Sequence, residues 1–514
     1  MKKLIYVAVA TLMLVSCQGE VETPSPSTSE TSINNPTFAI RNYSLSVNSG
    51  TEIIPIGQTE PGDFHYEYDD TNLSIWQNKI YVHKSNTTTT VKAIAKDGSF
   101  FEFNVASPVD TYESSERAEQ EENWLAPINF ADVNRNAKPM PRGLDVSTAA
   151  AIYRAGGQFY NEHGEAEDLF RILKRHGSNY VRLRLWNDPY NHTSAGKVTY
   201  GGGVCDLDHV LEMAFLAKQA GLEIYLVFHY SDFWADPGKQ VIPKQWAHIE
   251  TAGEMAEAIY TYTRETIETL KSHNLTPKIV SLGNETTPGM LVHMPGPTNE
   301  NLVGEPHYTS RKGEAPSAIR GNFGSQNYYD YIDAANRAVK DVDPSIQTMV
   351  HTERHIINRS KQIIDHYNFL EGIPFDIIGL SAYPYYQGTP DNFSQGLKLI
   401  SETFPDKLIT LAETSYGFTF APHQHLGAIF NASSMRGDYP VSVAGQARLL
   451  DELFAAINSI HNGYGLFYWE GAYIPYPGVG WADASTKNSW ANQALFTYDG
   501  HVLPSLRVFE LWEA

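Results

Sequence analysis

Two glutamates stand where apolar, strand-like runs end. Residues 278–285 read KIVSLGNE, a short β-branched run that stops at a Gly-Asn-Glu turn before a loop rich in Pro and Gly, so Glu285 follows a buried strand. Residues 408–414 read LITLAET and place Glu413 at the end of a second such run. Carboxylates at strand ends suit acid–base chemistry on a bound ligand. Each glutamate alone could instead be a cap or a partnered structural acid.

The elements around these glutamates repeat a strand–helix unit. Amphipathic stretches predict helices over residues 165–176, 207–219, 252–272, 328–339, 393–403 and 443–458. Eight such units predict an α/β fold, a (β/α)8 TIM barrel over residues 139–514. An open doubly wound sheet is the alternative, weakened because no glycine-rich phosphate turn follows residues 142–146. The predicted strands end at Asp145, Trp186, Tyr230, Glu285, Glu353, Tyr383, Glu413 and Glu470.

A barrel would bring these strand ends to one face. Glu285 after the fourth strand and Glu413 after the seventh would then point across its mouth. Two carboxylates about 5 Å apart can hydrolyse a glycosidic bond by double displacement, one as nucleophile and the other as acid and then base. The barrel therefore favours catalytic roles for both glutamates.

The first 36 residues predict an export signal followed by a tether. Lys2 and Lys3 precede an apolar run that is too short for a membrane span, as in a secretory signal. The segment LVSC at residues 14–17 resembles a bacterial lipoprotein cleavage site, which implies lipidation of Cys17; a plain secretory signal is the alternative. Residues 18–36 are rich in Ser, Thr, Pro and Glu and predict a disordered tether.

Residues 37–107 predict a small all-β domain. Seven strand candidates alternate with turn signals, which indicates an immunoglobulin-like sandwich that serves as a spacer or, as the second reading, binds carbohydrate. Trp76 is expected in its core rather than as a sugar platform. Residues 108–138 form a linker expected to wrap onto the barrel. The strand candidates cover residues 38–47, 52–56, 64–68, 73–76, 80–83, 91–95 and 100–105.

Composition limits the partners. The chain has 514 residues and a net charge of −21, which argues against binding nucleic acid or an anionic membrane surface. Cys17 and Cys205 are the only cysteines, so no disulfide framework is expected. With 30 Tyr, 23 Phe and nine Trp, aromatic side chains suffice for both a core and a sugar-stacking site.

Several long motifs resemble one family of glycoside hydrolases. The residues that carry the resemblance are GLDVS (143–147), NYVRLRLWNDPY (179–190), GGG (201–203), FHYSDFWADPGKQ (228–240), GNET (283–286), IGLSAYPYYQG (378–388), LAETSY (411–416), FYWE (467–470) and NQALF (492–496). They are similar to family 53 of clan A, the endo-β-1,4-galactanases, from about residue 141 to residue 504. The resemblance implies a TIM barrel and a reaction that needs no cofactor. It also implies that Glu285 is the acid/base and Glu413 the nucleophile.

The resemblance and the strand positions also suggest residues that support the reaction. Asn284 would bond the sugar hydroxyl next to the anomeric carbon. Arg182 or Arg184 should lie near Glu413 and keep it ionised, and we favour Arg184 because it is nearer the strand end. Other candidates that would line the cleft or orient the two glutamates are His229, Tyr383 and His351, the last of which could equally be a structural histidine.

Aromatic and acidic residues complete the predicted binding site. Trp469 is the best candidate for a platform under the cleaved sugar, extended by Trp186, Trp234 and Trp246 unless these pack under loops. Asp145 and Asp188 could bind sugar hydroxyls, whereas Asp236 is expected to fix its own loop.

Two loops depart from the family pattern. The long segment 286–327 should shape distant subsites, but Val292 stands near the position where galactanases commonly have a Trp. Some family members bind calcium after strand seven; here the segment TFAPHQHLGAIFN lacks paired carboxylates, and Ala491 stands where Asp is frequent. We therefore expect no metal site there.

Together these features predict a monomeric, lipid-anchored enzyme of the outer membrane, facing the cell surface. Its expected substrate is the β-1,4-galactan side chains of pectin or arabinogalactan, and its only membrane contact is the anchor. Another clan A endo-glycanase, such as a mannanase or endoglucanase, and a non-catalytic glycan-capture lipoprotein are the alternatives. The second is disfavoured because Glu285 and Glu413 are both present.

Overall fold

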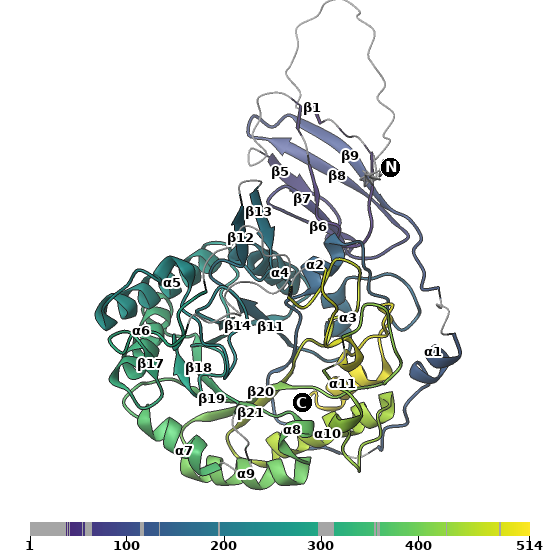
Figure 1. The fold of residues 1–514 in the computed structure, drawn as a ribbon. Coiled ribbons are helices and arrows are strands. Elements are labelled where there is room, and N and C mark those ends of the chain that lie inside the picture. The colour runs from purple at the N-terminus through teal and green to yellow at the C-terminus, as the bar shows by residue number, and fades with distance from the viewer. Residues whose placement is uncertain are drawn as a thin grey trace, which may run out of the picture.

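A computed structural model describes most of residues 37–514, in two parts: small N-terminal sheets and a large barrel (Figure 1). The described residues exclude 1–36, 39, 41, 54, 57–63, 114–117, 133, 194–195, 297–312, 354–355, 357–359, 428 and 483–484. The predicted signal, Cys17 and the tether therefore lie outside the described residues, as do residues 297–312 of the long loop. Among the described residues, no helix combines the length and apolar character needed to cross a bilayer.

Eight parallel strands close into a barrel, which confirms the predicted fold class. Their order around the barrel follows the chain, and β10 pairs with β21 to close the ring through Gly143 opposite Phe467. The strands are β10 (Arg142–Asp145), β11 (Tyr180–Leu185), β14 (Glu223–Phe228), β15 (Ile279–Ser281), β18 (Gln347–Thr352), β19 (Ile377–Ser381), β20 (Leu408–Thr414) and β21 (Gly463–Tyr468). Each predicted strand end falls within or a few residues beyond its observed strand, so the polar residues meet at one face.

Helices between the strands form the outer ring. The predicted bounds hold for α4 (Leu207–Gln219) and α5 (Ala252–Ser272), and their first turns are capped by Asp206 and Thr251, whose side chains accept backbone N–H groups. The ring also contains α2 (Ala149–Arg154), α3 (Leu169–Arg175), α6 (Gln326–Val342), α7 (Ser360–Phe369), α8 (Pro384–Gln387), α9 (Pro390–Thr403), α10 (Val443–Ser459) and α11 (Val508–Leu511).

The helix predicted over residues 165–176 is shorter than expected. It begins only after Asp168, whose carboxylate accepts the backbone N–H of Arg171 and so caps α3. The residues before the cap are held in extended bridges instead, Glu165 with Thr111 and Glu167 with Lys84. These bridges tie the start of α3 to the N-terminal region and prevent an earlier helix start.

The N-terminal part contains two main sheets. One has the order β2-β9-β8-β5 (Asn42–Ser44, Phe100–Ser107, Thr87–Ala95 and Phe64–Glu67), and the other has the order β3-β7-β6 (Thr51–Glu52, Lys79–Val82 and Leu73–Trp76). The first predicted strand is divided, because β1 (Thr37–Phe38) pairs separately with β4 (Pro55–Ile56). Gln77 and Asn78 both have positive φ, as the tight hairpin turn between β6 and β7 requires.

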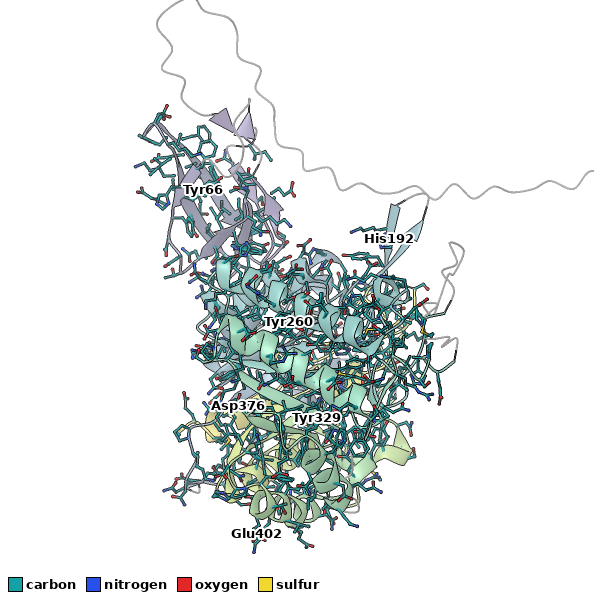
Figure 2. All side chains as sticks on the ribbon, turned by 90° about the vertical axis from the view of Figure 1, so that its left-hand side faces the viewer. Tyr66, His192, Tyr260, Tyr329, Asp376 and Glu402 are labelled. Atoms are coloured by element: carbon teal, nitrogen blue, oxygen red, sulfur yellow. The ribbon has the colours of Figure 1, made fainter. Side chains whose placement is uncertain are left out.

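Side chains from both parts interlock where the sheets meet the barrel. The Trp76 ring lies parallel to that of Phe215 on α4, with centroids 5.3 Å apart, and Asn48 donates a hydrogen bond to Asp168 at the start of α3. Trp76 is therefore not part of the core of the N-terminal sheets, as was expected, but packs between the two parts, and it is no surface platform. A hairpin of β12 (Tyr190–Thr193) and β13 (Gly196–Thr199) lies at the same end of the molecule as the N-terminal sheets. Figure 2 marks the sheets by Tyr66 and the hairpin by His192, and Glu402 lies at the opposite end.

The segment between the two parts contains one short helix, α1 (Ala118–Trp124). Trp124 packs edge-on against Phe418 and Tyr498 of the barrel, with centroids 5.2 and 5.5 Å away. The linker thus lies against the barrel, as expected. The long loop after Glu285 contributes the short pair β16 (Gly289–Met290) and β17 (Gly321–Asn322).

Candidate active site

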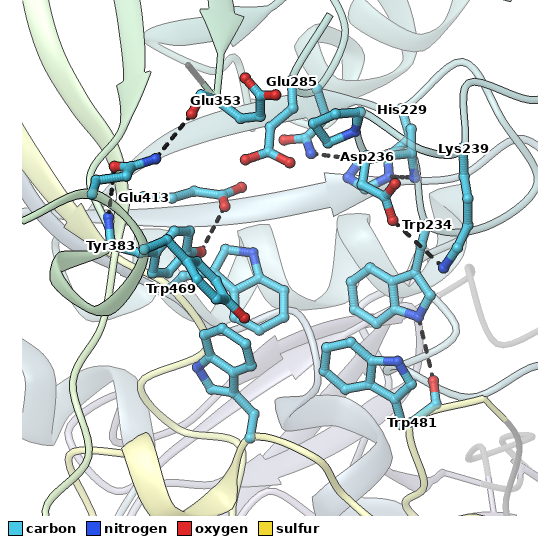
Figure 3. A pocket seen from close by; sticks show the side chains of 16 residues that line it. His229, Trp234, Asp236, Lys239, Glu285, Glu353, Tyr383, Glu413, Trp469 and Trp481 are labelled. Carbon is cyan, nitrogen blue, oxygen red and sulfur yellow. Dashed lines mark hydrogen bonds and ion pairs between the residues drawn. The ribbon is translucent and has the colours of Figure 1, made fainter. Parts of the chain in front are cut away.

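A cavity of about 550 Å³ lies over the carboxyl ends of the barrel strands (Figure 3). Glu285 and Glu413 both point into it, so the structure brings the two predicted glutamates together. The other lining residues are His229, Trp234, Ala235, Asp236, Pro237, Lys239, Asn284, Glu353, Tyr383, Tyr386, Gln387, Trp469, Trp481 and Trp490.

Glu285 is held in an unusual backbone conformation just beyond β15. Its φ is +47°, a left-handed value that non-glycine residues seldom adopt and that concentrates at functional sites. Its Oε1 lies 2.7 Å from the Ser381 hydroxyl at the end of β19. The strained turn thus aims the carboxyl group into the cavity and Ser381 fixes it there.

Glu413 projects from within β20 and has two strong partners. Nη2 of Arg182 donates to Oε1 at 2.6 Å, and the Tyr383 hydroxyl donates to Oε2 at 2.7 Å. A cation and a hydroxyl on the two oxygens stabilise the ionised form. This is the environment that a carboxylate nucleophile requires.

The two glutamates differ in what opposes their burial. For Glu285, burial and then the charge of Glu413 raise the pKa well above its usual range, which favours the protonated acid. For Glu413, burial also raises the pKa, but Arg182 and the Tyr383 hydroxyl act against that rise, so the pKa of Glu413 is raised less than that of Glu285. One glutamate is thus suited to hold a proton and the other to lose it, the division of roles found in paired-carboxylate sites.

Behind Glu413 the charged side chains alternate in sign. Arg182 also bonds Asp145, and Asp145 Oδ1 accepts Nη1 of Arg184 at 2.8 Å. Nη2 of Arg184 lies 2.5 Å from Oε1 of Glu470. We call Glu413, Arg182, Asp145, Arg184 and Glu470 the charge row. The preference for Arg184 as the partner of Glu413 was wrong: Arg182 reaches the nucleophile position, and Arg184 lies one step further back.

Several residues expected to contact substrate do not border the cavity. Asp145 is 0% exposed between the two arginines, so it cannot bind a sugar hydroxyl. Trp186 is also 0% exposed and donates its indole N–H to His229. Asp188 contacts His192 and Lys244 outside the cavity. Trp246 packs against Tyr262 on α5. Arg182 and Arg184 act on the site from beneath it and are shielded from substrate.

Asn284 and His229 do line the cavity. Oδ1 of Asn284 accepts Nη2 of Arg182 at 2.8 Å, and its Nδ2 donates to the carbonyl of Ala235. Nδ1 of His229 lies 3.1 and 3.0 Å from the N–H groups of Trp186 and Ala235, which only donate, and 3.3 Å from the carbonyl oxygen of Phe233. Because the two donors are nearer than the carbonyl, Nδ1 accepts and the ring proton lies on Nε2. Both residues thus have fixed orientations and each keeps one N–H free of these contacts.

Tryptophans form one wall of the cavity (Figure 3). Trp469 and Trp234 were predicted, whereas Trp481 and Trp490 were not. Trp481 is nearly parallel to Trp234, with centroids 4.8 Å apart. The GGG motif supports this wall, because a Cβ on Gly202 would lie 2.5 Å from the Trp234 ring. Trp481 and Trp490 follow strand eight, and their position after the last strand end was a usable signal.

The loop departures have mixed outcomes. Val292 is buried and does not line the cavity, so no stacking occurs at that position. Asp236, expected to fix its loop, does accept the backbone N–H of Gly238 and also borders the cavity. In the described part of the chain, no group of three or more His, Cys, Asp or Glu side chains is arranged to hold a metal ion.

A closed parallel barrel with two unlike glutamates in a tryptophan-lined cavity defines a glycoside hydrolase. Comparison with known proteins agrees: residues 141–509 match glycosyl hydrolase family 53. The chain therefore belongs to glycosyl hydrolase family 53.

Individual relatives cover most of this barrel. An endo-β-1,4-galactanase of Bacillus subtilis is 31% identical over 412 residues, which span 73% of this chain and 87% of that protein. An arabinogalactan endo-β-1,4-galactanase of Humicola insolens is 30% identical over 380 residues, 72% of this chain and 98% of that protein. The solved family 53 catalytic domain of Ignisphaera aggregans is 35% identical, with a TM-score of 0.62 over 76% of this chain and 99% of its own.

Proposed function

We propose that this enzyme hydrolyses internal β-1,4-galactosidic bonds of galactan or arabinogalactan. The observation that carries the proposal is the pair Glu285 and Glu413, which share one cavity in unlike environments. Family membership and the galactanase activity named for two relatives supply the substrate class. Tryptophan faces suit the apolar faces of sugar rings.

The reaction proceeds by double displacement with retention of configuration. Ionised Glu413 attacks the anomeric carbon and forms a glycosyl ester, while Glu285 gives its proton to the leaving glycosidic oxygen. Glu285, now ionised, takes a proton from water, and that water releases the sugar from Glu413. Arg182 and Tyr383 receive the charge of Glu413 again when the ester breaks.

Polar groups around the two glutamates orient the sugar. The second Nδ2 hydrogen of Asn284 and the Nε2 hydrogen of His229 are donors for ring hydroxyls. Burial and the two arginines keep the His229 pKa well below its usual value, so His229 stays neutral and acts as a hydrogen-bond donor without taking up a proton. Trp469 and Trp481 provide stacking surfaces.

The test compares substrates and follows stereochemistry. Purified enzyme is assayed on galactan, mannan and cellulose, with product length measured over time. Galactan should be shortened to mixed oligosaccharides, and the first product seen by NMR should have the β configuration. Preference for mannan or cellulose would favour the alternative clan A activities. An α-configured first product would reject double displacement.

We also propose that Cys17 carries a lipid that anchors the enzyme to the outer membrane, facing the cell surface. The support is the basic, apolar and small-residue order of residues 1–17 and the polar tether at 18–36. The N-terminal sheets, with four and three strands, would form an immunoglobulin-like spacer between tether and barrel, and the protein would act as a monomer. Replacement of Cys17 by Ala should release the protein from the membrane fraction, and externally added protease should degrade the native form on intact cells.

A further inference from the structure

A buried chain of hydrogen bonds connects the two glutamates through the floor of the cavity. From Arg182, Nη2 reaches Oδ1 of Asn284 at 2.8 Å, and the same oxygen lies 3.2 Å from Nδ1 of His351. Nε2 of His351 lies 2.9 Å from Oγ of Ser381, which lies 2.7 Å from Oε1 of Glu285. We call Arg182, Asn284, His351, Ser381 and Glu285 the floor chain. His351 and Ser381 are both 0% exposed, so these two side chains are shielded from bulk water.

The direction of donation is fixed at the Arg182 end. A guanidinium only donates, so the atom that meets it must be the amide oxygen of Asn284. The amide nitrogen is independently identified because it donates to the carbonyl oxygen of Ala235 at 2.9 Å. Since Oδ1 of Asn284 can only accept, Nδ1 of His351 must carry a hydrogen.

The same logic continues to Glu285. His351 is 0% exposed, and its ring nitrogens bond an amide oxygen and a hydroxyl, neither of which carries a charge that would stabilise a cation. Burial and the charge of Arg182 accordingly hold the pKa of His351 well below its usual value, so the ring is neutral and its Nε2 has no hydrogen. Ser381 must then donate its only hydrogen to Nε2 of His351. With its hydrogen directed to Nε2, Ser381 offers only an oxygen lone pair across its 2.7 Å contact with Oε1 of Glu285, so this arrangement requires a proton on Oε1, whereas an ionised Glu285 would accept the Ser381 hydrogen instead.

We propose that His351 and Ser381 are positioning residues that keep the acid/base proton on Glu285 in the free enzyme. Arg182 couples this proton to the nucleophile, because one guanidinium bonds both Glu413 and Asn284. The site is thus assembled with Glu413 ionised and Glu285 protonated, the two states that the first chemical step needs. The catalytic role of this proton rests on the proposed function, whereas its position on Glu285 does not.

Loss of the proton has a defined consequence. When Glu285 ionises, the Ser381 hydroxyl turns to donate to the carboxylate, and Nε2 of His351 is left buried without a donor. The Ser381 hydroxyl by itself lowers the Glu285 pKa when it donates to the carboxylate, but His351 competes for the same hydrogen and so opposes ionisation, in the same direction as the charges that face Glu285. Those charges belong to Glu413 on β20, Glu353 after β18 and Asp236 after β14.

The first experiment reads the tautomer of His351 directly, without substrate. Two-bond ¹⁵N–¹H NMR of the histidine-labelled protein, assigned with His351→Gln, should show the Nδ1–H tautomer of His351 from pH 5 to 7. An Nε2–H tautomer or a charged ring in that range would overturn the proposal. Because no turnover is needed, failure to cleave galactan would reject the proposed function and leave this result standing.

The second experiment measures the pH dependence of kcat/KM, which reports the free enzyme. The alkaline limb of this profile is the pH range in which activity falls as Glu285 loses its proton. His351→Phe keeps a ring but frees the Ser381 hydroxyl to stabilise ionised Glu285, so this limb should move to lower pH by about half a unit. His176→Phe is the matched control, since His176 is also buried but bonds Glu510 outside the cavity, and it should leave the limb in place.

A double-mutant cycle separates this role from a merely structural one. His351 acts on Glu285 only through Ser381, so His351→Phe in a Ser381→Ala background should shift the limb no further. An equal shift in both backgrounds, or an unchanged limb in the single variant, would overturn the proposal. If His351→Phe does not fold, the wild-type tautomer decides.

Discussion

Removal of the negative charge at the centre of the charge row should change how Glu413 titrates. Asp145 is fully buried, and both Arg182 and Arg184 donate to it. Asp145→Asn keeps the shape and the oxygen that accepts from Ser147, but removes the charge. The Asp145 charge raises the pKa of Glu413, and Arg182 and Arg184 lower it. The variant should therefore lower the pKa of Glu413, because two cations then face fewer anions.

The size of the shift follows from the geometry. Asp145 and Glu413 bond the two Nη atoms of one guanidinium, which places their charges about 6 Å apart. Two like charges at about 6 Å interact by roughly 2.8 kcal/mol at an effective dielectric constant of about 20, or about two pKa units. Turnover requires ionised Glu413 and is lost as the pH falls through its pKa. The acid limb of kcat/KM should thus move to lower pH by about one to two units.

The assay is a pH profile of kcat/KM on soluble galactan, with folding at each pH checked by circular dichroism. Asp145→Asn should also unfold at lower temperature, since it leaves two buried arginines with one partner fewer. Asp451→Asn is the matched control, because Asp451 pairs with Arg135 away from the cavity and its loss should leave the limb in place. A folded Asp145→Asn enzyme whose acid limb stays, or moves to higher pH, would refute the charge row as the source of the Glu413 environment.

Three further predictions address the glutamates, the tryptophan wall and the contact between the two parts. Glu413→Ala should abolish turnover with folding intact, whereas Glu285→Ala should spare aryl galactosides whose leaving groups need no proton; activity of Glu413→Ala on galactan would contradict the mechanism. Trp481→Ala should raise KM on galactan about three- to tenfold in steady-state assays, with little change on short aryl substrates, because a stacking surface is lost. Trp76→Ala should lower the free energy of unfolding by about 2 kcal/mol, because the contact between its ring and Phe215 is lost. The N-terminal sheets should then be proteolysed at a lower temperature on heating, and an altered kcat would contradict the assignment of Trp76 to packing.

The sequence predicted the parts of this molecule that depend on local pattern. Strand ends and helices were found because a buried parallel strand is a continuous apolar run and an outer helix has one apolar face. That was enough to predict a shared face for Glu285 and Glu413, because the carboxyl ends of all strands in a closed parallel barrel lie on the same face. The helix at residues 165–176 was predicted too long, because Glu165 and Glu167 are held in an extended conformation by contacts with residues far away in the chain.

The errors in the site have a common physical origin. Arg182 and Arg184 point to the same side of β11, and distance along the strand favoured Arg184 for Glu413. What decides is the set of partners on other strands: Asp145 on the neighbouring β10 accepts Nη1 of both arginines, and Glu470, which follows β21, pairs with Arg184. These partners depend on the register of the strands around the closed barrel, which no local pattern contains. Trp186 likewise looked like a platform but is covered by the GGG loop and Trp234.

The charge row and the floor chain meet at Arg182, and this gives the residue a role that neither network has alone. A lysine at this position would offer one ammonium to Glu413, Asp145 and Asn284 together, whereas the guanidinium presents separate N–H groups to each. Arg182→Lys should therefore loosen both the ionised nucleophile and the amide that orients the floor chain. We expect the acid limb to rise and the alkaline limb to fall, so that the active pH range narrows from both sides. A variant that moves one limb alone would show that the two glutamates are set independently, and the coupling through Arg182 would have to be abandoned.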